Sequence, residues 1–276
     1  MIKLFEEYND IVSICYKYDI ENYTINDDGS IDVDDDVCLY GLKLTKIPLK
    51  FGTVTGDFNC SENKLQSLEG CPKEVGKYFD CSVNNLISLE GCPDTAHGSF
   101  DCSYNELTSI KGCPEKIGGS FDCSNNRLSS LNGCPKEIGG NFFISSNQLV
   151  SLKGCPKEVI GTFTCSNNHL SSLEWCPTKV YGDFNCSSNH LVSLEGCPIV
   201  VGVDFNCNNN NLTSLKCVVD LGGNFHCSNN NLPTLIKKNY RRISDIIRTQ
   251  NDYSIWNSNG SLNEFRFNDM MKELEY

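Results

Sequence analysis

Apolar and polar positions alternate in short stretches that recur every 21 residues from Phe58 onward. In Phe121-Asp122-Cys123-Ser124 apolar and polar residues alternate, as in a β-strand that buries one face. A phenylalanine opens each stretch, at Phe58, Phe79, Phe100, Phe121, Phe142, Phe163, Phe184, Phe205 and, after a one-residue deletion, Phe225. A fixed period of this length predicts a solenoid in which every coil adds one strand to a parallel sheet.

Further columns follow the phenylalanine in each coil. A cysteine, an asparagine and two leucines recur, as in Cys60, Asn63, Leu65 and Leu68, before Gly-Cys-Pro or a variant turns the chain. The asparagines are predicted to bond backbone groups of their own and the adjacent coil, and paired glycines such as Gly118-Gly119 to permit a tight path into the next strand. A degenerate earlier coil brings the total to about ten. Coils this short leave little room for helices, so extended or 3₁₀ segments and modest curvature are expected on the convex side.

The repeat unit F-x-C-x-x-N-x-L-x-x-L-x-G-C-P resembles the L-x-L-x-x-N-x-L-x-x-L-P core of leucine-rich repeats. Its length and proline are similar to those of the short bacterial type. The stretches FDCSNNRLSSL and GCPKEIGG resemble repeats in uncharacterised proteins encoded by large tailed bacteriophages. The resemblance implies a leucine-rich-repeat solenoid, and it says little about function.

The two ends of the chain depart from the repeat and suit the caps that a solenoid needs over its terminal coils. Residues 1–20 are predicted to form a helix with one apolar face, made of Leu4, Tyr8, Ile11, Cys15 and Tyr18. Residues 22–34 are expected to form a hairpin that turns at residues 26–29. We therefore divide the chain into a small α/β N-terminal cap at 1–36, the solenoid at 37–235 and a helical C-terminal cap at 236–276.

In the C-terminal cap an apolar stripe through Tyr240, Ile243, Ile246 and Ile247 indicates one helix. The sequence Ser261-Leu262-Asn263-Glu264 has the form of a capping box and predicts the start of a second. A basic run in the same cap is a possible second surface or simply the polar side of a helix, and it comprises Lys237, Lys238, Arg241, Arg242 and Arg248.

The formal net charge of −12 argues against nucleic acid and anionic membranes as partners, because such a field repels phosphate. The first residues carry acids through their apolar stretch and lack a small-residue cleavage site, so we expect no signal peptide. No apolar run has the length that a membrane span requires. These features predict a soluble protein.

Eighteen cysteines raise three alternatives, namely buried free thiols, disulfides or a metal site. Ile144 and Leu39 stand in the column of cysteines that follows the phenylalanines, and such replacements suit a small buried hydrophobe better than a ligand or an obligate disulfide partner. We favour free thiols in a reducing cytoplasm, with no metal and no cofactor.

Catalysis finds little support in the sequence. The serine that recurs in nearly every coil is a feature of the repeat and not a nucleophile. Residues 27–35 partly imitate a calcium loop, and we favour a hairpin turn with solvated acids. The C-terminal region contains no cysteine and is too short for the ubiquitin-ligase domain that similar bacterial repeat proteins carry. We therefore predict that the protein is not an enzyme and has no catalytic residues.

The outward positions of the predicted strands form the candidate partner-binding surface. Asp80, Asp101 and Asp122 make an acidic ladder, which either attracts a basic partner or only keeps the sheet soluble. His169 and His190 occupy equivalent positions in adjacent coils and are expected to stack within about 5 Å. The pair could bind a metal ion or sense pH. We favour the interpretation that the histidines have no specific role, because this surface position varies from coil to coil. The complete candidate site is Asp57, Tyr78, Asp80, Asp101, Tyr104, Asp122, Phe143, His169 and His190.

The sequence thus predicts a protein-binding module with a partner that has a basic surface. The phage resemblance suggests that the module inhibits a host protein, such as a defence component, in the bacterial cytoplasm. Two alternatives stay open, the sequestration of a small signalling molecule such as a nucleotide and a structural role in a virion. The sequence does not indicate the oligomeric state.

Overall fold

The computed structural model describes residues 2–274, and it describes side chains from residue 9 onward. The predicted contributions of Leu4 and Tyr8 to a helix face therefore lie outside the described side chains. The chain forms two compact units, residues 1–140 (unit 1) and 141–276 (unit 2). Each unit is a stack of short parallel strands, which confirms the solenoid that the repeat predicted. The solenoid has about nine turns of ~21 residues, where the sequence indicated about ten coils.

Unit 1 has a front sheet built from the strands that begin with the recurring phenylalanine and from β3 of the degenerate first coil. Its parallel order is β3 (Val37–Cys38), β5 (Phe58–Asn59), β7 (Phe79–Asp80), β9 (Phe100–Asp101) and β11 (Phe121–Asp122). Equivalent residues pair across neighbouring coils, Phe79 with Phe100 and Asp80 with Asp101. This register stacks identical side chains on one another, which was the central prediction of the repeat.

The rear sheet of unit 1 contains β1 (Tyr23–Ile25), β2 (Ile31–Val33), β4 (Phe51–Val54), β6 (Glu74–Val75), β8 (Thr95–Ala96), β10 (Lys116–Ile117) and β12 (Glu137–Ile138). Its strands confirm the extended segments expected opposite the front sheet. Strands β1 and β2 pair antiparallel and confirm the predicted hairpin, while β2 pairs in parallel with β4.

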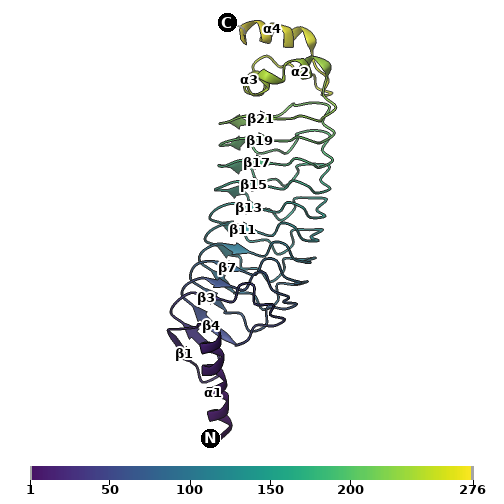
Figure 1. Ribbon diagram of the computed structural model, residues 1–276. Coiled ribbons are helices and arrows are strands. Elements are labelled where there is room, and N and C mark those ends of the chain that lie inside the picture. The colour runs from purple at the N-terminus through teal and green to yellow at the C-terminus, as the bar shows by residue number, and fades with distance from the viewer. Residues whose placement is uncertain (1, 275–276) are drawn as a thin grey trace. The chain divides into compact units, whose positions relative to one another are not determined.

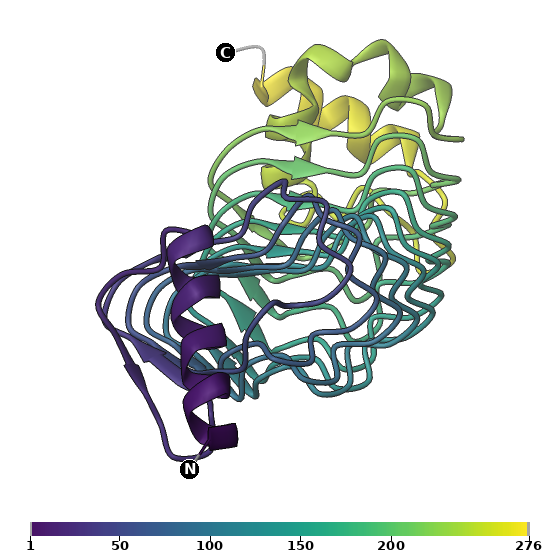
Figure 2. The same cartoon turned by 60° about the horizontal axis from the view of Figure 1, so that its bottom comes forward.

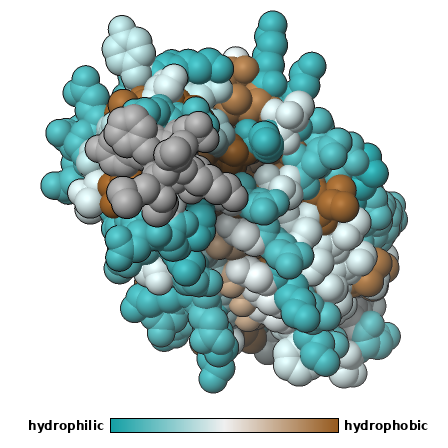
Figure 3. Space-filling view, turned by 90° about the horizontal axis from the view of Figure 1, so that it is seen from below, coloured by the Kyte–Doolittle hydropathy of each residue, from teal (hydrophilic) through white to brown (hydrophobic). Residues whose placement is uncertain are grey.

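Helix α1 (Ile2–Lys17) confirms the predicted N-terminal helix, and it lies at the end of the unit 1 stack next to the hairpin (Figures 1 and 2). Cys15 on this helix and Ile20 just after it are buried. The surface at this end is mostly hydrophilic, with hydrophobic side chains only in small separate groups (Figure 3). A polar outer face is what a terminal cap of a solenoid requires.

Unit 2 repeats the same architecture. Its front sheet orders β13 (Phe142–Phe143), β15 (Phe163–Thr164), β17 (Phe184–Asn185), β19 (Phe205–Asn206) and β21 (Phe225–His226) in parallel. Its rear sheet contains β14 (Glu158–Val159), β16 (Lys179–Val180), β18 (Val200–Val201) and β20 (Asp220–Leu221).

The C-terminal cap of unit 2 consists of α2 (Thr234–Lys238), a 3₁₀ turn η1 (Tyr240–Arg242), α3 (Ile243–Thr249) and α4 (Glu264–Leu274). The hydroxyl of Ser244 accepts the backbone N–H of Phe225 at 2.9 Å. The guanidinium of Arg248 donates to the carbonyl of Leu221 at 3.3 Å. The cap thus supplies hydrogen bonds to backbone groups in both sheets, and Arg248 contributes one of them.

The capping-box prediction at Ser261 is wrong, because α4 begins only at Glu264. The carboxamide oxygen of Asn263 accepts the backbone N–H of Arg266 at 3.1 Å, so Asn263 caps the helix. Ser261 instead donates to Asn259 in the preceding turn. Of the predicted apolar stripe, Ile243, Ile246 and Ile247 are buried and Tyr240 is half-buried, while α4 buries Phe267 and Met270.

The interior of each unit is filled by the phenylalanine, cysteine and leucine columns, whose members are almost fully buried. Neighbouring phenylalanine rings lie 5.9 Å apart at Phe58 and Phe79 and 5.7 Å apart at Phe163 and Phe184, in both cases nearly parallel. Ile144 is fully buried at a cysteine position, as expected for a site that accepts any small hydrophobe. Burying one phenylalanine stabilises the fold by about 1.5–3 kcal/mol.

Glycine is required where the backbone of one coil approaches the next. A Cβ atom added at Gly118 would collide with the carbonyl oxygen of His97 in the preceding coil. The tight path that the Gly-Gly pairs predicted is therefore a consequence of coil-to-coil contact.

No helix in the described part of the chain has the length and apolarity to cross a membrane.

Candidate functional site

The acidic ladder of unit 1 is formed by Asp80, Asp101 and Asp122, which stand opposite one another on β7, β9 and β11. Each carboxylate accepts the backbone N–H of the serine two residues later, at 2.8–2.9 Å. Tyr78 donates its hydroxyl hydrogen to Oδ2 of Asp101 at 3.2 Å. The structure therefore brings four of the predicted site residues together.

The ladder is more deeply buried than the sequence predicted. Asp80 is only 8% exposed, so the prediction of a solvent-facing side chain is wrong there, and Asp101 and Asp122 are half-buried. The serines that follow the ladder are also buried, namely Ser82, Ser103 and Ser124. The ladder is buried because each of its strands has a neighbouring strand on both sides, and because each carboxylate turns back to bond the backbone of its own strand.

Burial has an electrostatic consequence for the ladder. It raises the pKa of Asp101, and the charge of Asp80 raises this pKa further against the hydrogen bonds from Ser103 and Tyr78. Burial and the charge of Asp101 likewise raise the pKa of Asp122. Burial and the Asp101 carboxylate also raise the pKa of Tyr78, which keeps its phenol as a hydrogen-bond donor. Among the described residues, no lysine or arginine forms an ion pair with Asp101 or Asp122, so hydrogen bonds alone stabilise their charged forms.

Asp57 and Tyr104 flank the ladder in unit 1. Asp57 is partly exposed and accepts the backbone N–H of Tyr78 at 2.8 Å, so it has a structural role in addition to its predicted one. Tyr104 is 60% exposed and has a positive φ of 52°. Its equivalent one coil earlier, Val83, has the same φ and is 44% exposed.

This column of positive φ was not identified from the sequence. Most other coils place asparagine or serine there, and asparagine tolerates the left-handed region well. A β-branched residue such as Val83 is strained there. The signal that could have found it is the alignment of Val83 and Tyr104 with Asn125 across successive coils.

In unit 2 the predicted residues fall into two separate groups. Phe143 is half-buried on β13, opposite Thr164 on β15, so an aromatic ring interrupts a polar row as predicted. The rings of His169 and His190 stack with their centroids 5.8 Å apart and an interplanar angle of 8°. The predicted stacking is confirmed, at a slightly longer distance than expected.

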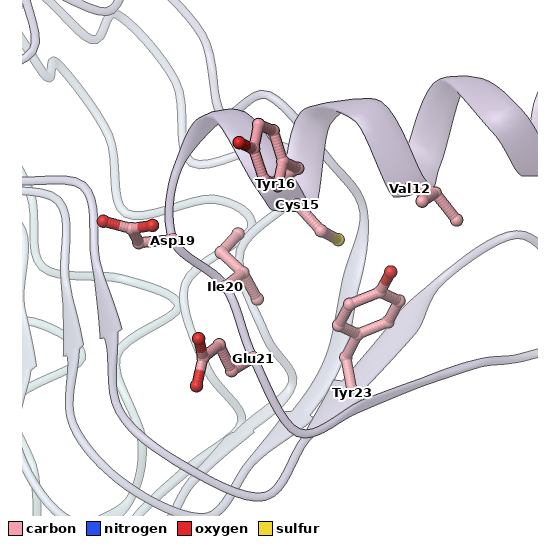
Figure 4. A pocket seen from close by; sticks show the side chains of 7 residues that line it. All are labelled: Val12, Cys15, Tyr16, Asp19, Ile20, Glu21 and Tyr23. Carbon is pink, nitrogen blue, oxygen red and sulfur yellow. The ribbon is translucent and has the colours of Figure 1, made fainter.

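A cavity of about 310 Å³ lies between α1 and β1 in unit 1 (Figure 4). Val12, Cys15, Ile20 and Tyr23 contribute to its lining, and the Cys15 thiol is directed toward Tyr23. Burial raises the pKa of Cys15, which opposes the thiolate form that a nucleophile needs.

The core thiols show the same tendency. Burial raises the pKa of Cys92 and Cys227 to about 12. The thiols of Cys81 and Cys102 donate to the carbonyls of Asp101 and Asp122, each at 3.4 Å. These sulfurs belong to the packing of the interior.

The acids of residues 27–35 bond within the hairpin and to the next coil, where Asp32 accepts the backbone N–H of Thr53. Asp28 accepts hydrogen bonds from the backbone and hydroxyl of Ser30 and pairs with Lys50. The ammonium of Lys50 and the bonds from Ser30 hold the pKa of Asp28 well below its usual range. Within the described residues, no group of three or more histidine, cysteine, aspartate or glutamate side chains is arranged to hold a metal ion.

No protein-family model matches the chain, and no curated protein is significantly similar to it. Among solved structures, the chain is similar to YopM from Yersinia enterocolitica WA-314, with 21% identity and a TM-score of 0.41. The match covers 73% of this chain and 51% of that chain, so the similarity spans about half of the YopM chain.

Proposed function

We propose that this chain is a non-catalytic binding module whose strand face contacts a protein with a basic surface. The observation that carries the proposal is the position of Asp101, in register between Asp80 and Asp122 and partly removed from water. Like charges directly opposite one another on neighbouring strands destabilise a sheet. A lysine or arginine from a partner would offset both the repulsion and the lost hydration.

Aromatic and apolar groups next to the ladder support a protein as the partner. Tyr78 is hydrogen-bonded to the ladder, and Tyr104 and Val83 project from the ends of the same coils. Tyrosine next to a charged pair is a common composition for an interface centre. In unit 2, Phe143 and the pair His169 and His190 are further contact residues within the proposal.

The biological setting of the proposal comes from the repeat sequence, which resembles repeats in proteins encoded by large tailed bacteriophages. We propose that the protein acts in the bacterial cytoplasm during infection and blocks or redirects a host protein, such as a defence component. Binding to a cationic partner would lower the raised pKa values of Asp101 and Asp122, so it would be accompanied by proton release at pH values where these carboxyls are partly protonated.

The test is a pull-down from bacterial host lysate with the wild-type protein and an Asp101→Asn/Asp122→Asn variant, which removes charge and keeps side-chain volume. Asp94→Asn is the matched control, because Asp94 is an exposed acid of unit 1 away from the ladder. We expect a basic protein that the wild type and the control retain at micromolar concentration and that the double variant releases. Retention of no protein, or equal retention by the double variant, would contradict the proposal.

A further inference from the structure

Two histidines of unit 2 lie side by side on consecutive coils. The backbone N–H of His169 donates to Leu149 at 2.9 Å, and that of His190 donates to Leu170 at 2.8 Å, which places both residues in the same register. Their rings are nearly parallel, with centroids 5.8 Å apart, and both side chains are exposed. Two imidazoles are therefore held next to each other at a solvent-accessible position.

The environment of this pair differs from that of the other two histidines. His97 contacts the carboxylate of Glu74 at 2.9 Å, and His226 lies 3.5 Å from that of Asp204. For His169 and His190, the described part of the chain provides the other imidazole as the ring partner and no ion pair. In the same column the preceding and following coils carry Gln148 and Asn211. The pair thus has neutral neighbours in its column, and among the described residues neither ring is paired with a carboxylate.

We propose that His169 and His190 together bind one divalent transition-metal ion of the Cu²⁺, Ni²⁺ and Zn²⁺ class. Neutral imidazole is a preferred ligand of these ions. Two nitrogens at about 2.0–2.1 Å from one ion lie at most ~4.2 Å apart. The rings must therefore turn so that one nitrogen of each approaches the other more closely than the centroids do now. Both residues follow the front-sheet strand of their coil and have exposed side chains, and neighbouring coils stack about 4.8 Å apart, so the rings can make this movement.

The site is open, because the described residues supply only two ligands, so water or another ligand would complete the coordination of a bound ion. This arrangement favours an ion whose other positions are already occupied by a chelator, and it leads to a specific probe. In the complex of Cu²⁺ with nitrilotriacetate, the chelator fills four positions and leaves two adjacent ones. A lone surface histidine fills only one of these, whereas a pair within reach fills both.

The experiment titrates Cu²⁺-nitrilotriacetate into protein that lacks a polyhistidine tag and follows binding by calorimetry and by electron paramagnetic resonance. We expect one bound copper per chain, with the nitrogen hyperfine pattern of two equivalent imidazoles. His169→Gln and His190→Asn place the residues of neighbouring coils in this column, so both variants should fold normally. Each should weaken binding at least ~10-fold, since the loss of second-shell support alone has such an effect.

His97→Gln and His226→Asn are the matched controls and should bind copper like the wild type. Circular dichroism checks that all four variants are folded. The proposal is wrong if the wild type gives a one-nitrogen pattern or no binding, or if the control variants lose affinity as much as His169→Gln and His190→Asn. Neither result would depend on the partner of the strand face.

Discussion

The side-chain oxygen of Asn84 accepts the backbone N–H of Leu65, one coil earlier, at 2.9 Å. The amide nitrogen of the same side chain donates to the carbonyls of Cys60, Cys81 and Ser82 at 3.0–3.2 Å. One buried side chain thus bonds backbone groups of two coils at the point where the chain leaves the front sheet. The other columnar asparagines of both units are buried in the same way, so this contact joins coil to coil along each unit.

Replacing Asn84 with alanine should destabilise the protein by about 2–5 kcal/mol, because several buried backbone groups lose their partner and each costs about 1–3 kcal/mol. Urea denaturation followed by circular dichroism measures the change. The exposed neighbour Asn85 provides the control, and Asn85→Ala should stay within about 0.5 kcal/mol of the wild type. Similar losses in the two variants would show that the buried hydrogen bonds are not what holds the coils together.

The acidic ladder should make stability depend on pH in a predictable direction. Because the pKa of Asp101 is raised in the folded state, its contribution to stability is present below the unfolded value of about 3.9 and is lost as pH rises through the folded pKa. Asp101→Asn should therefore be more stable than the wild type near pH 7, by about 0.5–1 kcal/mol. The difference should shrink as the solution is acidified.

Asp204 of unit 2 gives the opposite sign and serves as the control for the Asp101 experiment. Its carboxylate accepts the backbone N–H of Asn224 at 2.7 Å, and this bond lowers its pKa. Its contribution to stability is present above the unfolded pKa and is lost as pH falls through the folded pKa. Asp204→Asn should therefore be less stable than the wild type near pH 7, with a difference that also shrinks on acidification. Two variants that change stability in the same direction would refute the assignment.

The repeat determined which residues face inward, and it did so for a physical reason. In a strand with one buried face, the alternation of apolar and polar residues indicates which side chains point inward. The alignment of successive coils indicates which side chains lie next to each other, as with His169 and His190. The alternation does not predict how much of an outward side chain is exposed. The burial of Asp80 depends on the strands on both sides of it, which the sequence of one coil does not show. The start of α4 was misplaced because Ser261 and Asn263 are both suitable caps, and the geometry of the preceding turn decides between them.

The core cysteines should be protected from alkylation in the folded protein. The thiolate is the reactive form, and burial raises the pKa of Cys102, Cys165 and Cys186 far enough to suppress it. Cys38 is exposed and should react with iodoacetamide first. Mass spectrometry of peptides after timed labelling compares the sites, and urea should equalise them. Rapid labelling of the three core thiols without denaturant would contradict the burial of the cysteine column.

A reciprocal exchange at the positive-φ column tests whether Val83 is retained at a cost in stability. Val83 has a φ of 52° and Asn125, two coils later, a φ of 55°. The left-handed region costs most residues about 1–2 kcal/mol and asparagine less. Val83→Asn should therefore raise the free energy of unfolding by about 1 kcal/mol, and Asn125→Val should lower it by a similar amount. Both residues have exposed or half-exposed side chains, so packing contributes little to either change.

If Val83→Asn is stabilising and also weakens retention of the partner, the strain is maintained for contact at the strand face, because a purely structural residue would not improve stability on removal. If Val83→Asn is destabilising, Val83 packs against its neighbours more than its exposure indicates, and its assignment to the contact surface is wrong.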